Sequence, residues 1–316
     1  MRAFVTGGAG FIGSNLVDRL LAEGQTVDVV DNLTTGSLAN LAEARKAKLG
    51  RLTFHQLDVR SPDLSELMNR CHPDVVFHLA AQADVRVSVA DPVFDAEVNI
   101  IGSLRVLEGA RSSGAQKVVF ASSGGTIYGD PDPSDLPVKE SHPQIPISPY
   151  GVAKKVVSDY LYAYRELHNI EFTSLALANV YGPRQDPHGE AGVVAIFAGR
   201  MLSDQPCTIF GDGKQTRDFV YVDDVVDAFA RAAERGGGLV LNVGTGVETS
   251  VNRLYQAMAS HAGVNRPAVR APARRGELER SCLDPSRARI HLGWKPWTSL
   301  DEGAAAVIDW FRSRPG

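Results

Sequence analysis

The first 180 residues alternate short apolar segments with longer segments of helical periodicity. Strands that alternate with helices predict a parallel sheet. The apolar segments lack a strict polar and apolar alternation, which is typical of strands covered by helices on both faces. We therefore predict an α/β fold with a doubly wound parallel sheet. The predicted strands are residues 3–6, 26–31, 52–58, 74–80, 117–122 and 172–178.

After residue 180 the alternation of predicted strands and helices becomes less regular, and Gly and Pro residues separate short strands from helical segments. We predict a first domain over 1–180 and a smaller α/β domain mainly over 181–316. Residues 218–223 and 239–243 are two strands that can return to the first sheet. The predicted later helices are residues 191–203, 223–235, 250–262 and 299–313.

Composition narrows the classes of function. The net charge of -4 gives no attraction to nucleic acid, and no apolar run approaches the length of a membrane span. Cys71, Cys207 and Cys282 are odd in number and lack metal-ligand spacing, so we expect no disulfide framework and no metal site. The chain begins directly with a predicted strand, which leaves no room for a signal peptide. We expect a cytoplasmic protein that acts on small molecules.

A glycine-rich turn joins the first predicted strand to the first helix. Gly7, Gly10 and Gly13 permit a tight turn and a close approach of backbone to a pyrophosphate, which the helix N-terminus attracts. Asp31 ends the second predicted strand, where its carboxylate can bond the ribose hydroxyls of a dinucleotide. The same carboxylate repels a 2′-phosphate, so the pattern favours NAD over NADP.

A tyrosine and a lysine share one face of a later helix. Ser148 is a candidate N-cap and Pro149 suits the first turn, so Tyr150 and Lys154 lie one turn apart. A tyrosine with the reference pKa of about 10 is a poor base at neutral pH. A nearby ammonium group and a cationic nicotinamide would stabilise its phenolate. The pair therefore indicates proton transfer beside a dinucleotide.

Residues 122–129, with the sequence SSGGTIYG, follow a predicted buried strand. Hydroxyl groups at the end of a rigid strand are well placed for chemistry. Together with further segments along nearly the whole chain, these features resemble the extended short-chain dehydrogenases/reductases that modify nucleotide sugars. The further segments are Asp58-Val59, residues 78–82, Asn99 and residues 179–184, 210–213, 216–224, 242–246 and 292–296.

The resemblance implies a Rossmann-like fold, NAD as cofactor, a UDP-sugar as substrate and C4 epimerisation through a transient 4-keto sugar. Tyr150 and Lys154 would be catalytic. The serine or threonine usual four residues before Tyr128 is here Gly124, so we prefer Thr126 as the replacement hydroxyl, with Ser123 as the alternative. The implied cofactor-binding residues are Gly7, Gly10, Phe11, Ile12, Gly13, Asp31, Asn32, Gly36, Asp58, Val59, Leu79, Ala80, Ala81, Gln82, Asn99, Ser122, Tyr150 and Lys154. The implied substrate-binding residues are Ser123, Thr126, Tyr150, Asn179, Val194, Arg217, Arg274 and Ser281.

Two other functions compete with this interpretation. A nucleotide-sugar 4,6-dehydratase or decarboxylase typically needs an acid where Gly125 and Thr126 stand, and a silent NAD-binding regulator usually lacks the Tyr150 and Lys154 pair. The resemblance also implies a homodimer through helices at 92–113 and 149–168, which carry apolar side chains on more than one face, including Val156, Val157, Tyr160 and Leu161. The resemblance places Ser281 where a bulky tyrosine or a small residue stands beside the 2-position of the sugar, so it implies room for an N-acetyl group.

Overall fold

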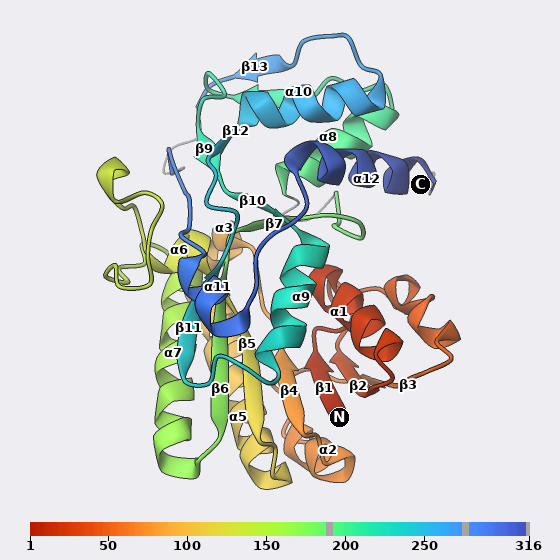
Figure 1. The fold of residues 1–316 in the computed structure, drawn as a ribbon, viewed down its shortest axis with the longest axis vertical. Coiled ribbons are helices and arrows are strands. Elements are labelled where there is room, and N and C mark those ends of the chain that lie inside the picture. Colours follow the sequence, from red (N-terminus) through yellow and green to blue (C-terminus); the bar gives the residue numbers. More distant parts are fainter. Residues whose placement is uncertain (188–191, 274–277, 314–316) are drawn as a thin grey trace.

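The computed structural model describes residues 1–187, 192–273 and 278–313. A seven-stranded sheet with the order β11-β6-β5-β4-β1-β2-β3 forms its centre, and all pairings in this sheet are parallel (Figure 1). The order reverses between β1 and β4, and ligands of such sheets bind at this point. The predicted α/β class is confirmed. The strands are β1 (Arg2–Thr6), β2 (Thr26–Asp31), β3 (Arg51–Gln56), β4 (Val75–His78), β5 (Lys117–Ser123), β6 (Glu171–Leu177) and β11 (Leu239–Val243).

Helices cover both faces of this sheet (Figure 1). Phe4 and Val5 are adjacent in β1, yet both are fully buried and belong to different apolar clusters. Successive side chains of a strand point to opposite faces, so both faces must be apolar. The first cluster is covered by α2 (Leu64–Cys71), α5 (Gly102–Ser113) and α7 (Pro149–His168), and the second by α1 (Phe11–Ala22), α9 (Val222–Ala232) and α11 (Ser286–Leu292).

A smaller part of the chain lies above the carboxyl edge of the sheet in Figure 1. The described strands β8 and β13 pair there in parallel, β9 and β12 pair antiparallel, and β7 pairs with β10. These elements are β7 (Asn179–Tyr181), α8 (Val193–Leu202), β8 (Thr208–Phe210), β9 (Thr216–Arg217), β10 (Phe219–Tyr221), β12 (Thr249–Ser250), α10 (Val251–Ala262), β13 (Val269–Ala271) and α12 (Leu300–Arg312).

Of the two strands expected to return to the large sheet, one does so. β11 pairs with β6 along its whole length, from Leu239 opposite Thr173 to Val243 opposite Leu177. Because β11 takes this edge, β10 pairs instead with β7, beyond the sheet. The expectation for residues 218–223 is therefore wrong.

The helix predicted at 92–113 is divided in the structure. A π-helical turn at Glu97–Ile101 (η3) separates α4 (Pro92–Ala96) from α5 and contains the buried Asn99. Such turns are frequent at functional sites. The other short elements are η1 (Leu38–Leu41), η2 (Ala44–Lys46), α3 (Val85–Ala90), α6 (Gly124–Ile127) and η4 (Pro133–Asp135).

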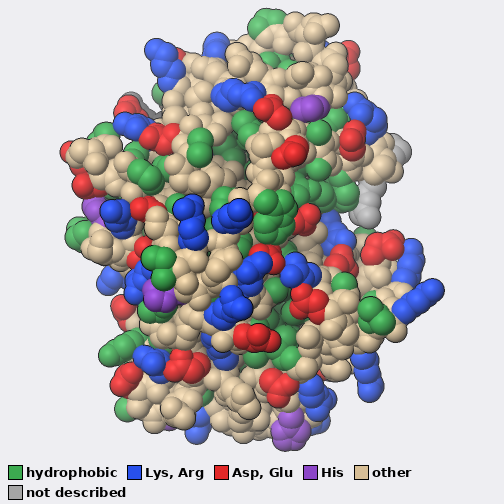
Figure 2. Space-filling view, viewed as in Figure 1, with side chains coloured by type: hydrophobic (Ala, Val, Ile, Leu, Met, Phe, Trp, Pro, Cys, Tyr) green, Lys and Arg blue, Asp and Glu red, His purple; other side chains and the backbone are tan. Residues whose placement is uncertain are grey.

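Acidic and basic side chains are interspersed on the face seen in Figure 2. Some ion pairs of the protein join elements that are distant in sequence. Arg19 of α1, for example, pairs with Asp227 of α9 at 3.2 Å. Among the described residues, no helix is both long and apolar enough to cross a bilayer.

The segment after α11 is anchored on α9 by Trp294. This side chain is 1% exposed, and its Nε1 donates to the Asp224 carbonyl at 2.7 Å. We expect Trp294→Ala to lower the free energy of unfolding by about 3–5 kcal/mol, because it leaves a large cavity. Trp297 is 56% exposed, so Trp297→Ala should change it by only about 0.5 kcal/mol. Urea unfolding followed by circular dichroism measures both, and equal losses would contradict the assignment.

Candidate active site

The glycine-rich turn after β1 is shaped for close backbone contact. Gly7 has φ +70°, and a Cβ there would lie 2.7 Å from the Ala80 amide nitrogen. A Cβ at Gly13 would collide with the Gly7 carbonyl oxygen. α1 begins at Phe11, and its N-cap Gly10 has no side chain to cap the first amides. These amides are available to an anionic pyrophosphate.

Asp31 lies at the carboxyl end of β2, beside this turn. Its carboxylate accepts hydrogen bonds from the Ala9 amide at 3.0 Å and the Leu33 amide at 2.8 Å. A Cβ at Gly36 would lie 2.8 Å from Asp31 Oδ1, so glycine lets the next loop approach the carboxylate. The buried negative charge disfavours a 2′-phosphate at this position.

Asn32 and Asp58 meet beyond the ends of β2 and β3. Asn32 Nδ2 donates to Asp58 Oδ2 at 2.8 Å, and Arg60 donates to both oxygens of the same carboxylate. The Arg60 guanidinium holds the pKa of Asp58 well below its usual range. Asp58 therefore stays ionised and fixes the Asn32 loop in place, with the buried Val59 next to it.

A continuous hydrogen-bond network fills the space behind the β4 loop. The Ala80 amide donates to Thr6 Oγ1, which lies 2.7 Å from His78 Nδ1, while His78 Nε2 lies 2.8 Å from Ser103 Oγ. Since Ser103 donates its own proton to the Asn99 carbonyl, the geometry favours a neutral His78 that carries its proton on Nε2. Burial lowers the pKa of His78 to about 3, in agreement with this state.

The π-helical turn aims Asn99 at the same loop. Asn99 Oδ1 accepts from the Gln82 amide at 2.9 Å, and its Nδ2 donates to the Gln82 carbonyl and to Asp95 Oδ1. Leu79, Ala80 and Ala81 lie between these fixed ends. The loop is therefore held rigidly where β4 meets the switch point of the sheet.

Tyr150 and Lys154 lie in the first turns of α7, as predicted, and the Ser148 hydroxyl caps this helix by accepting from the Gly151 amide. Lys154 Nζ is buried and donates to the Ala121 carbonyl at 2.9 Å. It lies 5.5 Å from the centroid of the Tyr150 ring. Burial lowers the pKa of Lys154 to about 8, and Asp95 partly offsets this effect. The cation is positioned to stabilise negative charge on Tyr150.

The segment after β5 forms the short helix α6, and Gly124 is its first residue. A Cβ at Gly124 would collide with Leu283 Cδ1 and would lie 3.1 Å from the Ala176 carbonyl oxygen. A larger residue at this position would therefore require Leu283 to move. Thr126 Oγ1 donates to the Ser123 carbonyl at 3.3 Å. Ser122 Oγ is buried and has no hydrogen-bond partner within the described part of the chain, so it can bond a cofactor.

A cavity of about 140 Å³ opens beside this segment. It brings together five of the predicted substrate-binding residues from distant parts of the chain. The Ser281 amide donates to the Thr216 carbonyl at 3.2 Å, and the Thr216 amide donates to the Glu279 carbonyl at 2.9 Å, so the segment around Ser281 forms one wall. The cavity is lined by Ser123, Gly125, Thr126, Leu177, Ala178, Asn179, Arg217, Leu278 and Ser281.

Three predicted substrate residues are not among those that line this cavity. Tyr150 lies in α7, outside the lining. The side chain of Val194 is 1% exposed and packs in the apolar cluster that includes α8 and α9. Arg274 lies outside the described residues. The substrate-binding roles of all three stay predictions.

Sequence reasoning missed several residues that shape the site. Leu278 lines the cavity and Leu283 fills the space beside Gly124, but no local pattern marks either leucine. Asp218 is 1% exposed, and its carboxylate accepts from the amides of Thr245, Gly246 and Leu283. An acid directly before the apolar run at residues 219–222 was the available signal for Asp218.

Comparisons with known proteins agree with this geometry. The model of the NAD dependent epimerase/dehydratase family matches residues 3–244, and the chain belongs to this family. It is 50% identical to the UDP-glucose 4-epimerase of Mycolicibacterium smegmatis, over 99% of both chains. Among solved structures it resembles two UDP-glucose 4-epimerases, each over 99% of both chains. They are that of Thermotoga maritima with UDP-glucose (45% identity, TM-score 0.93) and that of Thermus thermophilus with NAD (43%, 0.91).

The contact between Gly124 and Leu283 generates a prediction. We expect Gly124→Ser to lower the free energy of unfolding by about 1–3 kcal/mol, because the added atoms overpack the site. In the double variant with Leu283→Ala the serine gains room, so the combined loss should be smaller than the sum of the single losses by about 0.5–3 kcal/mol. Urea unfolding of the four proteins measures this difference.

Gly125→Ala is the matched control for this experiment, since no atom lies within 4 Å of a Cβ built there. It should stabilise the protein by at most about 1 kcal/mol. Strictly additive losses for positions 124 and 283 would contradict the steric explanation.

Proposed function

We propose that this protein catalyses the NAD-dependent C4 epimerisation of UDP-hexoses, interconverting UDP-galactose and UDP-glucose. One observation carries the proposal. The cavity with Thr126, Asn179 and Arg217 lies at the carboxyl edge of the sheet that also holds the glycine turn and the Tyr150–Lys154 pair. The similarity to UDP-glucose 4-epimerases over the whole chain supports it.

The described residues fit NAD as the cofactor. The glycine turn and the first amides of α1 would hold its pyrophosphate, and Asp31 would accept hydrogen bonds from its adenosine ribose. The buried Ser122 hydroxyl lacks a partner among the described residues, and the loop at 79–82 borders the same site. When bound, NAD would supply the means to take up a hydride from C4 of the sugar and to return it to the opposite face.

The residues of the chain move the proton and hold the substrate. Tyr150, as the phenolate, takes the proton of the 4-hydroxyl group and later returns it, while Lys154 stabilises the phenolate charge. The Thr126 hydroxyl bonds the reacting sugar oxygen in place of the residue that Gly124 lacks. Arg217 and Asn179 hold the diphosphate, with Arg274 and the α8 segment at Val194 as further contacts.

The competing functions are less well supported. The cavity wall carries Gly125 and Thr126 where a 4,6-dehydratase or decarboxylase typically has an acid. A silent regulator has no need of a buried lysine beside Tyr150, and this chain has one.

We also infer a homodimer in the cytoplasm. Val157 and Leu161 of α7 are buried in the protein's own core, whereas Ile101, Val152 and Tyr160 are exposed and available to a second copy. The three cysteines are free and buried, which suits a reducing compartment.

The direct test supplies UDP-galactose and NAD to the purified protein and measures UDP-glucose. We expect conversion that requires bound or added NAD and gains little from NADP, because of the carboxylate of Asp31. Tyr150→Phe should remove most of the activity. Equal activity with both cofactors, or no conversion of UDP-galactose, would contradict the proposal.

The identity of the replacement hydroxyl has its own test. We expect Thr126→Ala to reduce kcat about 10²- to 10⁴-fold, the range typical of a lost proton-transfer partner. Ser123→Ala is the matched control, because both hydroxyls line the cavity. If Ser123→Ala is the damaging change and Thr126→Ala is tolerated, the assignment of Thr126 is wrong.

Ser281 should make the substrate range broad. Its small side chain lines the cavity and leaves room for an N-acetyl group at the 2-position of the sugar, so we expect UDP-N-acetylglucosamine and UDP-N-acetylgalactosamine to interconvert as well. Ser281→Tyr should depress this reaction and spare UDP-galactose, whereas Ser281→Ala should keep both. Equal loss of both reactions in the tyrosine variant, or no N-acetyl reaction in the wild type, would refute the explanation.

A further inference from the structure

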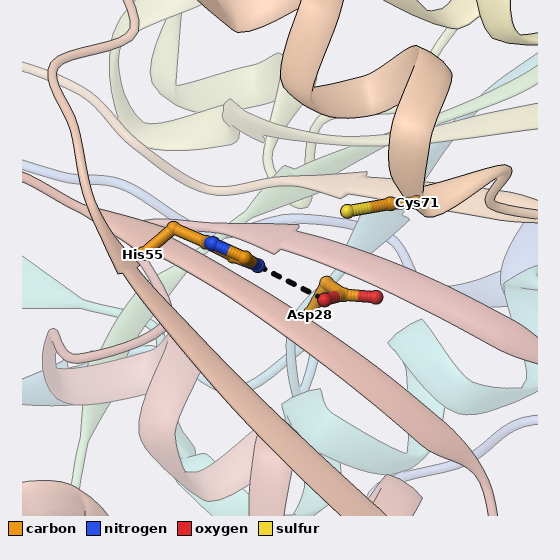
Figure 3. Close-up of side chains that lie close together, drawn as sticks. All are labelled: Asp28, His55 and Cys71. Carbon is orange, nitrogen blue, oxygen red and sulfur yellow. Dashed lines mark hydrogen bonds and ion pairs between the residues drawn. The ribbon is translucent and has the colours of Figure 1, made fainter.

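A second group of reactive side chains lies between β2, β3 and α2, near the β3 end of the sheet. Asp28 of β2, His55 of β3 and Cys71 at the end of α2 converge there (Figure 3). Asp28 and Cys71 are buried and His55 is partly exposed. Arg2 and Thr26, at the starts of β1 and β2, border the same cavity, which has a volume of about 250 Å³. This cavity is separate from the candidate active site.

We propose that Asp28, His55 and Cys71 form a binding site for a zinc-like divalent cation. A carboxylate oxygen, an imidazole nitrogen and a thiolate sulfur are the donor set that zinc prefers. Three protein ligands leave the fourth tetrahedral position facing the cavity, where water completes the coordination. The thiol proton of Cys71 leaves to solvent when the metal binds.

The geometry needs little adjustment. The potential ligand atoms all lie within 4.8 Å of one another, and His55 Nε2 is 3.0 Å from Asp28 Oδ1. Ligand atoms of a tetrahedral zinc site lie roughly 3.3–3.6 Å apart, given bond lengths of about 2.0–2.3 Å. Zinc binding therefore requires the longest distance between two ligand atoms to shorten by about 1 Å. Small side-chain rotations provide this change.

The charges around the site are compatible with a cation. Asp28 and the Cys71 thiolate together neutralise a divalent ion. Arg2, Arg51 and Arg70 also line the cavity, and Arg70 is already paired with Glu66 at 2.7 Å. Burial raises the pKa of Cys71 to about 11, so the thiol is protonated until a metal displaces the proton. The arginines leave a bound anion as the rival occupant of the cavity.

A metal here would join the three elements that support the adenosine end of the dinucleotide site. β2 carries Asp31 three residues beyond Asp28, and β3 leads to Asp58 three residues beyond His55. Clamping both strands to α2 stabilises this half of the sheet. The site is therefore structural rather than part of the epimerase reaction.

The test uses the full-length protein without a histidine tag. We expect elemental analysis to find zinc in up to equimolar amount. After chelation, added Co²⁺ should give the intense ultraviolet charge-transfer absorption of a thiolate ligand and the visible bands of tetrahedral cobalt. Zinc should raise the Tm of the chelated protein.

Matched variants separate this site from adventitious binding. Cys71→Ser should remove the charge-transfer absorption, whereas Cys207→Ser should keep it, since Cys207 is also free and buried but is not part of the cluster. His55→Ala removes a partly exposed side chain, so it should fold, and it should weaken Co²⁺ binding by more than the roughly 10- to 100-fold cost of losing an outer partner.

Three outcomes would overturn the proposal. The first is a wild-type protein that retains no zinc and shows no thiolate absorption with Co²⁺. The second is an absorption that survives both Cys71→Ser and His55→Ala. The third is a Tm that rises with sulfate or phosphate, but not with zinc, and rises equally in Cys71→Ser, which would assign the cavity to an anion.

Discussion

The hydrogen bond from Lys154 Nζ to the Ala121 carbonyl is the interaction on which the candidate active site depends. A buried ammonium group is costly unless it is bonded and paired. Here the Ala121 carbonyl of β5 accepts a hydrogen bond from the ammonium group, and Asp95 supplies the opposite charge. The centre of the Phe120 ring lies 4.8 Å from Lys154 Nζ. This arrangement fixes the start of α7 against the end of β5. Tyr150 and the hydroxyls of Ser123 and Thr126 are thereby held at the same edge of the sheet.

Local patterns in the sequence predicted much of this framework. The helix at residues 149–168 and its Ser148 cap were found with correct bounds, because the cap, Pro149 and the apolar periodicity are all local signals. The glycine turn and Asp31 were likewise readable, since each requirement of a dinucleotide site acts within a few residues. Five predicted substrate residues also meet around one cavity, although their roles stay predictions.

The remaining features depend on contacts between distant segments. Gly124 packs against Leu283, which is more than 150 residues away and belongs to no recognisable local motif. β11 occupies the edge of the large sheet, and β10 pairs with β7 instead. The β-propensity of a segment does not indicate which of two predicted strands will take such an edge. The π-helical turn at Asn99 was hidden inside a normal helical pattern. The sequence did not predict the cluster of Asp28, His55 and Cys71 either, because the three residues come from separate elements and do not have the spacing of a metal-binding motif.

The position of β11 bears on how the protein folds during synthesis. β6 is complete once residue 177 has been made, but the strand that covers its outer edge is residues 239–243. Until that strand emerges, β6 presents unpaired backbone groups to any other extended chain. A nascent chain stalled in this interval is prone to edge-to-edge association. The large sheet therefore gains its last strand only after much of the smaller part has been made.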